Sequence, residues 1–249
     1  MNRISRRTWL AGGLSAAAGV GVAAALARRN GLIPPDAGLR FGTGATLTYA
    51  AQRLLTRHSH AREFPRSQIS ARPFANPTQM KEAAYQQSLE ARFAGWELAV
   101  EGLVTRPGPI ALSELKRLPA RRQITQLVCE EGWSYIAEWT GAPLASVLEA
   151  AGARPEARYV VYYSMEPGWW DSVDMADALH PQTLLAYGMN GSPLPPEFGG
   201  PLRMRVPRQL GYKSVKFINR LVVTDNLKGF GKGYGSAPPE FGYSWYAGI

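Results

Sequence analysis

The chain has 249 residues, enough to bury one substantial hydrophobic core but too few to favour two compact domains. Its hydrophobic fraction of 45% and charged fraction of 19% are typical of a soluble globular protein and argue against a disordered or polytopic membrane protein. The net charge of +9 favours anionic ligands such as phosphorylated cofactors. No stretch interleaves basic and aromatic residues and no nucleic-acid motif occurs, so we expect no nucleic-acid partner.

Residues 1–27 predict export. A basic head containing Arg6 and Arg7 precedes an apolar run from Trp9 to about Ala27, which is the organisation of a signal peptide. The order Ser-Arg-Arg-Thr-Trp-Leu resembles the twin-arginine motif, with Trp9 where Phe is usual. The twin-arginine route carries folded proteins and so suits an enzyme that loads a cofactor before export. We predict a periplasmic protein whose first segment is either cleaved or kept as a membrane anchor.

Residues 28–75 are rich in Gly, Pro, Arg and His and predict a linker and wrapping arm. A single domain is then predicted at 76–249. Its apolar and polar patterning predicts strands and short helices in alternation, and therefore an α+β fold built on a mixed β-sheet. The predicted strands are 96–104, 122–129, 158–165, 199–207 and 215–225, and the predicted helices are 112–119 and 143–152.

The Gly-rich run 229–235 does not predict a dinucleotide-binding loop. Such a loop opens a helix, so that its amide groups and the helix dipole face the pyrophosphate. Here Ala237, Pro238 and Pro239 follow instead.

Cys129 is the only cysteine, and it ends a predicted strand where a loop containing Gly132 begins. An internal disulfide is impossible, which is unusual for an exported chain. A thiol at such a position serves as a metal ligand, a nucleophile or an inert buried group, and the residue type alone leaves all three open. A thiol hydrolase would need a histidine base, for which His180 is the candidate in the globular part.

The sequence around Cys129 resembles the cofactor-binding loop of the sulfite oxidase superfamily. The resemblance rests on CEEGWS at 129–134 and WTGAPL at 139–144, and it continues through 178–218 to the terminal YSWYAGI. Within the superfamily the chain is most similar to the periplasmic protein-methionine-sulfoxide reductase catalytic subunits and related small bacterial molybdoenzymes. The resemblance implies a sulfite-oxidase-type molybdopterin-binding fold, with molybdenum and molybdopterin as cofactors.

The same resemblance implies the site residues. Cys129 would be the sole protein ligand to molybdenum, and Ser164 falls near a family threonine that contacts the cofactor. A phosphorylated pterin needs cationic donors and backbone amides, which the run GYKSVK at 211–216 supplies through its lysines, hydroxyl and glycine turn. The residues that would hold the pterin and its phosphate are Arg203, Ser214, Val215 and Lys216.

Two departures from the family pattern stand out. Phe198 occupies a position where relatives usually carry His or Asn, so one cofactor hydrogen bond is lost or supplied by another group. The stretch 62–64 only faintly resembles a cofactor-contacting stretch. Phe198 also motivates an alternative, a binding protein that keeps the cofactor fold without turnover.

The expected reaction is oxygen-atom transfer. Glu130 and Glu131 directly follow the metal ligand and work against binding of the sulfite dianion. Four tryptophans of this region either wall an apolar pocket or pack in the core: Trp133, Trp139, Trp169 and Trp170. We therefore predict reduction of a neutral S-oxide or N-oxide such as methionine sulfoxide, as a small molecule or in a peptide, with sulfite oxidation as the alternative. No CxxCH haem motif occurs, so electrons must come from a partner, which the resemblance implies is a membrane b-type cytochrome.

Overall fold

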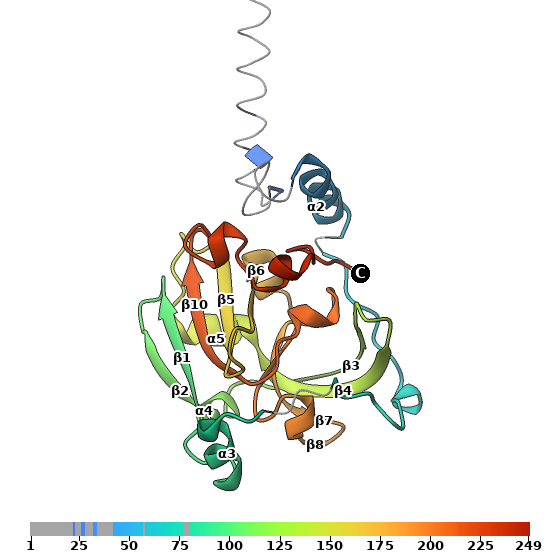
Figure 1. Cartoon of the computed structure of the whole chain (residues 1–249), viewed down its shortest axis with the longest axis vertical. Helices are drawn as coiled ribbons and strands as arrows, with labels where there is room; N and C mark the ends of the chain where they lie inside the picture. The colour runs from blue at the N-terminus through green and yellow to red at the C-terminus, as the bar shows by residue number, and fades with distance from the viewer. Residues whose placement is uncertain (1–21, 23–25, 28–31, 34–41, 57, 77–79) are drawn as a thin grey trace, which may run out of the picture. The chain divides into compact units, whose positions relative to one another are not determined.

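The computed structural model describes residues 22, 26–27, 32–33, 42–56, 58–76 and 80–249 (Figure 1). The chain divides into two units, 1–57 and 58–249. The first contains helix α2 (Gly42–Thr56), in a stretch for which the sequence predicted a linker. The predicted export motif lies outside the described residues. Within the described ranges, no helix has both the length and the apolar character needed to cross a membrane.

The second unit contains two five-stranded sheets. The first has the strand order β2-β1-β10-β5-β6, and the parallel pairing of β1 with β10 makes it a mixed sheet, as predicted. Its other strand pairs are antiparallel, with Val161 opposite Ser172 between β5 and β6. Its strands are β1 (Glu97–Gly102), β2 (Gly108–Ala111), β5 (Tyr159–Ser164), β6 (Trp170–Asp174) and β10 (Ile218–Thr224).

The second sheet is antiparallel throughout and has the order β3-β4-β7-β8, with β9 also paired to β7. Figure 1 shows β3 and β4 as a long hairpin on the side of the unit away from β1 and β2. The sequence predicted β3 and β9 but not β4 or β7. Its strands are β3 (Arg121–Val128), β4 (Ser134–Pro143), β7 (Leu184–Met189), β8 (Ser192–Pro193) and β9 (Arg203–Arg205).

Short helices connect these strands. α5 (Leu144–Ala151) ends where Gly152 adopts a left-handed conformation (φ +70°), which confirms the predicted glycine stop. The helix predicted at 112–119 is confined to α4 (Leu112–Leu115). The others are α3 (Ala83–Glu90), α6 (Met175–Ala178) and the 3-10 turns η1 (Arg66–Gln68), η2 (Pro196–Phe198), η3 (Gly211–Lys213), η4 (Gly231–Gly233) and η5 (Pro238–Phe241).

The segment 58–76 runs alongside the β3–β4 hairpin. The Phe64 N–H donates to the Ile124 carbonyl of β3 (2.9 Å), and the Ser70 N–H donates to the Ile136 carbonyl of β4 (2.9 Å). These bonds satisfy backbone groups that an exposed sheet edge would leave to water. The segment thereby reaches the end of β3, where Cys129 lies.

Two apolar clusters hold the unit together. The larger packs alternate residues of β1, β5 and β10, such as Val100 and Leu221, against α5. The smaller combines Leu127 of β3, Trp139 of β4 and Ala186 of β7 with Phe198. This second cluster forms the floor beneath the cavity described below.

Candidate functional site

The β3–β4 hairpin fixes the position of Cys129. β3 ends at Val128, and the Cys129 N–H donates to the Trp133 carbonyl across the loop (2.9 Å). The Gly132 N–H returns to the Cys129 carbonyl (3.2 Å), and its φ of +91° is a conformation that glycine adopts without strain. The predicted place of Cys129, at the end of a strand before a glycine turn, is confirmed.

Cys129 lines a cavity of about 440 Å³, a volume within the usual range of small-molecule sites. Four residues that the resemblance assigned to the pterin and its phosphate line the same cavity, although they follow Cys129 by 74 or more positions. These residues are Arg203, Ser214, Val215 and Lys216.

Close contacts bring the stretch 211–216 to Cys129 and to the turn after η2. A Cβ added at Gly211 would lie 3.1 Å from Leu127 Cδ2 and 3.4 Å from Cys129 Cα. A Cβ at Gly199, whose φ is +100°, would lie 2.7 Å from Lys216 Cβ. Glycine at both positions therefore lets this loop approach β3 and the turn after η2.

Arg203 lies at the inner end of the cavity and is buried. Its guanidinium donates to the carbonyls of Phe198 (2.8 Å) and Ser214 (2.6 Å) and lies over the ring of Trp139. Burial lowers the pKa of Arg203 because the charged form loses its hydration. Its Nε has no hydrogen-bond partner among the described residues. Arg203 and Arg205 share one face, since both lie over Trp139.

Lys216 is partly buried, and its ammonium donates to the carbonyls of Asn76 (2.9 Å) and Glu197 (2.8 Å). Burial lowers the pKa of Lys216 to about 8, and the nearby charge of Arg203 adds to the shift. Within the part of the chain that the structure describes, neither Lys216 nor Arg203 makes an ion pair with a carboxylate. The inner part of the cavity therefore carries positive charge that the protein does not pair directly.

Two carboxylates face the thiol. Cys129 Sγ lies 3.4 Å from Glu130 Oε2 and 3.7 Å from Glu131 Oε2, and both glutamates line the cavity. Both glutamates lie in the turn that follows β3. Burial raises the pKa of the Cys129 thiol to about 12, and the two negative charges contribute to the rise.

The tryptophans divide between the two roles that the sequence left open. Trp133 and Trp169 line the cavity. Trp139 is buried in the smaller apolar cluster, and Trp170 stacks on Tyr163. Phe198 lines the cavity and packs edge-on against Tyr135, so an apolar ring occupies this part of the lining.

Three residues highlighted by the sequence lie elsewhere. Ser164 is not a lining residue; its hydroxyl accepts from the Glu166 N–H (2.9 Å), in the turn that carries Glu166 and Trp169 to the cavity. Lys213, expected to serve the phosphate, is fully buried away from the cavity and paired with Asp171. His180 is also outside the cavity that holds Cys129, which removes the geometry of a thiol–histidine hydrolase.

Sequence reasoning missed several lining residues. Phe74 and Asn76 come from the segment 58–76, which runs alongside β3 and β4. Phe241 and Tyr243 come from the last ten residues. The terminal YSWYAGI belonged to the family resemblance, and it was the one available signal for Tyr243. Phe74 and Asn76 carried no comparable signal.

These donors fit a phosphorylated pterin that carries a metal ion. The cavity offers a soft thiol ligand at Cys129 and unpaired positive charge at Arg203 and Lys216. The backbone N–H groups of Val215 and Lys216 are hydrogen-bonded to no other described residue, and both residues line the cavity. A bound cation would also favour the thiolate form of Cys129 over the protonated form.

Comparison with known proteins agrees with this geometry. The family described as "Oxidoreductase molybdopterin binding domain" matches residues 85–229, more than half of the chain. A putative protein-methionine-sulfoxide reductase subunit, YedZ1, of Azospira oryzae is 40% identical over 159 residues, which cover 64% of this chain and 58% of the relative. The protein-methionine-sulfoxide reductase catalytic subunit MsrP of Xanthomonas campestris pv. campestris is 37% identical over 142 residues, which cover 51% and 44%. The chain thus spans about half the length of these curated relatives.

A solved structure is also similar. The sulfane dehydrogenase SoxCD from Paracoccus pantotrophus matches with a TM-score of 0.50 and 25% identity, over 53% of this chain and 38% of that chain.

Proposed function

This chain belongs to the oxidoreductase molybdopterin-binding domain family, and on that premise we propose that it is an exported molybdenum-cofactor enzyme that reduces a neutral sulfoxide or N-oxide. One observation carries the proposal. The only thiol of the chain shares a cavity with Arg203 and Lys216, whose positive charges have no ion-pair partner among the described residues. Methionine sulfoxide, free or in a peptide, is the substrate that the names of the Azospira and Xanthomonas relatives suggest.

Each group has a defined part in this proposal. Cys129 ligates the metal as a thiolate, while Arg203 and Lys216 neutralise the pterin phosphate. Ser214 accepts from the Val206 N–H and the Arg205 guanidinium, so its hydroxyl proton remains available to a phosphate oxygen. The N–H groups of Val215 and Lys216 complete the phosphate site. A cofactor contact by Ser164 stays a prediction from the resemblance.

The charge near Cys129 favours a neutral substrate. Glu130 and Glu131 repel a dianion such as sulfite, whereas they oppose a sulfoxide far less. Rings of Trp133 and Trp169 supply apolar surface for the substituents on sulfur. These features argue for sulfoxide reduction over sulfite oxidation.

Reduction of a sulfoxide breaks one sulfur–oxygen bond and consumes two electrons and two protons, releasing a sulfide and water. The molybdenum cofactor supplies oxygen-atom transfer and redox chemistry when bound. The electrons enter singly from a partner protein, for which we propose a membrane b-type cytochrome. A periplasmic location follows from the twin-arginine motif at Arg6 and Arg7.

The test uses purified, cofactor-loaded protein. We expect molybdenum by elemental analysis, a paramagnetic signal from the half-reduced metal, and faster turnover of methionine sulfoxide than of sulfite. Cys129→Ser should lose both the signal and the activity, because oxygen is a poor substitute for a soft thiolate. Protein without molybdenum would refute the proposal, and preferred turnover of sulfite would replace it with the alternative reaction.

A second candidate rests on Phe198. A protein that binds the cofactor without turning it over would retain molybdenum and yet reduce no sulfoxide. Replacing Phe198 with Asn restores the polar type usual in relatives and discriminates the two. Activity that appears only in Phe198→Asn supports the binding protein, whereas activity in the natural chain supports the enzyme.

A further inference from the structure

The C-terminal segment contributes two aromatic rings to the cavity. Phe241 stacks on Trp169, with ring centroids 6.3 Å apart, and Tyr243 stacks on Tyr212 at 5.2 Å with an angle of 17° between the rings. Both rings line the cavity and yet remain accessible, Phe241 at 67% and Tyr243 at 37%. Large apolar side chains that stay accessible around a cavity mark a surface that an apolar group can cover.

A second aromatic pair lines the same cavity. Phe74 and Trp133 lie 4.9 Å apart, and Phe74 is 49% exposed. The indole N–H of Trp133 donates to Glu131 (2.7 Å), which fixes the orientation of its ring. Accessible rings therefore come from two segments distant in sequence, one before β1 and one at the C-terminus.

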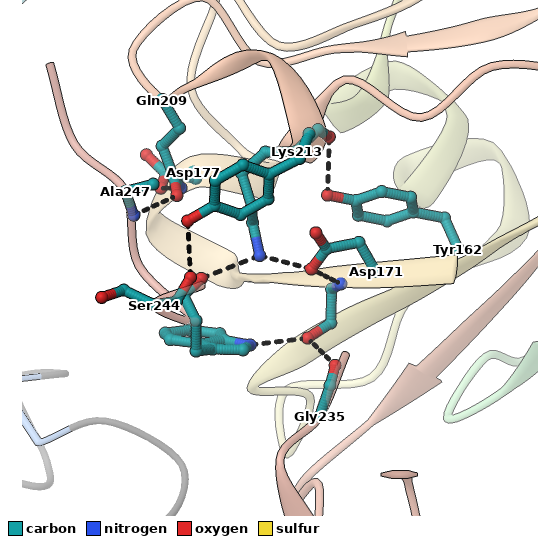
Figure 2. A network of polar contacts seen from close by, with 11 residues as sticks. Tyr162, Asp171, Asp177, Gln209, Lys213, Gly235, Ser244 and Ala247 are labelled. Atoms are coloured by element: carbon teal, nitrogen blue, oxygen red, sulfur yellow. Dashed lines mark hydrogen bonds and ion pairs between the residues drawn. The ribbon is translucent and has the colours of Figure 1, made fainter. Parts of the chain in front are cut away.

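A buried polar network holds the residues that directly follow Tyr243 (Figure 2). The Lys213 ammonium pairs with the Asp171 carboxylate and donates to the Trp245 carbonyl (2.8 Å). The Trp245 indole N–H donates to Ser172 Oγ (2.8 Å), and the Tyr212 hydroxyl donates to the Ser244 carbonyl (2.6 Å). The network fixes the residues that follow Tyr243 and so sets the position of its ring.

Further hydrogen bonds hold the segment that follows Tyr243. The Ala247 N–H donates to the Gln209 side chain (3.1 Å), and the Leu210 N–H donates to the Ala247 carbonyl (2.9 Å). A ring held by its neighbours loses little conformational entropy when a ligand covers it, so more of the contact energy contributes to affinity.

We propose that Phe241 and Tyr243 determine substrate specificity by binding the larger apolar substituent on the sulfur of a sulfoxide. The inference rests on the proposed function and adds the preference for size and apolarity. Aromatic faces bind apolar groups and make favourable contacts with sulfur, whereas a small sulfoxide such as dimethyl sulfoxide offers the rings little apolar surface. Phe241 and Tyr243 are specificity residues, and the chemistry stays with the groups around Cys129.

Binding of a sulfone tests the inference independently of turnover. Methyl phenyl sulfone has the shape of an aryl sulfoxide but is not a substrate for oxygen removal. Its dissociation constant is measured by NMR titration for the cofactor-loaded natural chain, Phe241→Ala, Tyr243→Ala and Leu179→Ala. Leu179 is a matched control because it is an exposed apolar residue, at 51%, that does not line the cavity.

We expect each ring truncation to weaken sulfone binding roughly three- to tenfold, the effect of losing one aromatic contact. Leu179→Ala should bind as the natural chain does. In turnover assays the KM for methyl phenyl sulfoxide should rise in both ring variants, while the KM for dimethyl sulfoxide stays unchanged. The kcat for each of the two sulfoxides should also stay unchanged.

The outcomes separate this inference from the proposed function. Equal affinity in all four proteins, or no sulfone binding by the natural chain, would overturn the role of the rings. Ring-dependent sulfone binding without turnover of any sulfoxide would uphold the rings and refute the reductase. Far-ultraviolet circular dichroism of each variant verifies that the exposed substitutions leave the fold intact.

Discussion

Lys213 and Lys216 lie three residues apart, and the protein surrounds them in opposite ways. Lys213 is fully buried and its charge is balanced inside the protein by Asp171. Lys216 faces the cavity and meets only backbone carbonyls as hydrogen-bond acceptors. A charge balanced by the protein holds the fold, whereas positive charge left unpaired at a cavity is available to an anionic ligand. The same short stretch therefore anchors the C-terminal segment and lines the cavity that we propose as the cofactor site.

The largest expected effect concerns the buried ion pair of Lys213 and Asp171. Lys213→Met leaves the Asp171 carboxylate buried without its cation, which costs about 3–5 kcal/mol of unfolding free energy. Urea denaturation of the cofactor-free protein measures the loss. The double variant Lys213→Met with Asp171→Asn removes both charges and should recover most of it. A single variant as stable as the natural chain would show that the ion pair does not anchor the C-terminal segment.

The buried imidazole of His180 extends the comparison from charged groups to a neutral one. Burial and the charge of Arg208 lower the pKa of His180 to about 4, below its ordinary value near 6.5. The unfolded chain therefore binds the proton first as the pH falls. The stability that His180 contributes in its neutral form is present above pH 6.5 and is lost between about pH 6.5 and 4.

His180→Asn should remove this pH dependence. Asparagine keeps an acceptor for the Gln182 N–H, to which His180 Nδ1 is bound at 3.2 Å. We expect the drop in unfolding free energy from pH 7 to pH 4 to be smaller in His180→Asn by up to about 3 kcal/mol. His58→Asn, at an exposed histidine, serves as the control and should fall as the natural chain does. Identical drops in unfolding free energy in all three proteins would contradict the assignment of this pH dependence to His180.

Sequence patterning predicted much of the fold, because β1 and β3 alternate in burial and β5 is rich in β-branched and aromatic residues. β1, β3, β5 and β10 were predicted, and the family match over 85–229 confirmed the resemblance built on the loop after β3. β4 was missed because residues such as Glu138 and Trp139 are buried side by side, which breaks the alternation. Tertiary burial on both faces of a strand is not visible in a period of two.

The site divides in the same way. Cys129 and Arg203 were predicted from the family resemblance, and both line the cavity. Lys213 and Lys216 look alike in sequence, and only the fold reveals which one meets Asp171. Phe74 reaches the cavity through backbone bonds of its segment to β3 and β4, a long-range arrangement that no local pattern encodes.

Lys216, the lysine without a carboxylate partner among the described residues, is expected to affect retention of the cofactor. Lys216→Met removes a charged donor from the proposed phosphate site and should weaken cofactor binding by about 1.5–3 kcal/mol, roughly ten- to a hundredfold. The molybdenum-to-protein ratio after dilution and gel filtration measures this retention. The stability of the cofactor-free chain should fall less than in Lys213→Met, because the substitution removes two hydrogen bonds to carbonyls but leaves no carboxylate unpaired.

Lys228→Met, at an exposed lysine outside the cavity, is the matched control and should retain the cofactor. Lys216→Met and Lys213→Met form a crossed design, in which Lys213→Met mainly loses fold stability and Lys216→Met mainly loses cofactor. A stability loss in Lys216→Met as large as in Lys213→Met would mean that its charge also supports the fold, and the contrast between the two lysines would disappear.

The smallest effect is expected at Tyr212, which belongs to both regions. Its ring lines the cavity and stacks on Tyr243, while its hydroxyl donates to the Ser244 carbonyl at 2.6 Å. Tyr212→Phe removes the hydrogen bond alone and should cost about 1 kcal/mol of unfolding free energy, with unchanged molybdenum content. Tyr243→Phe removes a hydroxyl from the same ring pair and is the matched control. If Tyr212→Phe loses molybdenum while Tyr243→Phe keeps it, the C-terminal anchor and the cofactor site are coupled through this hydroxyl.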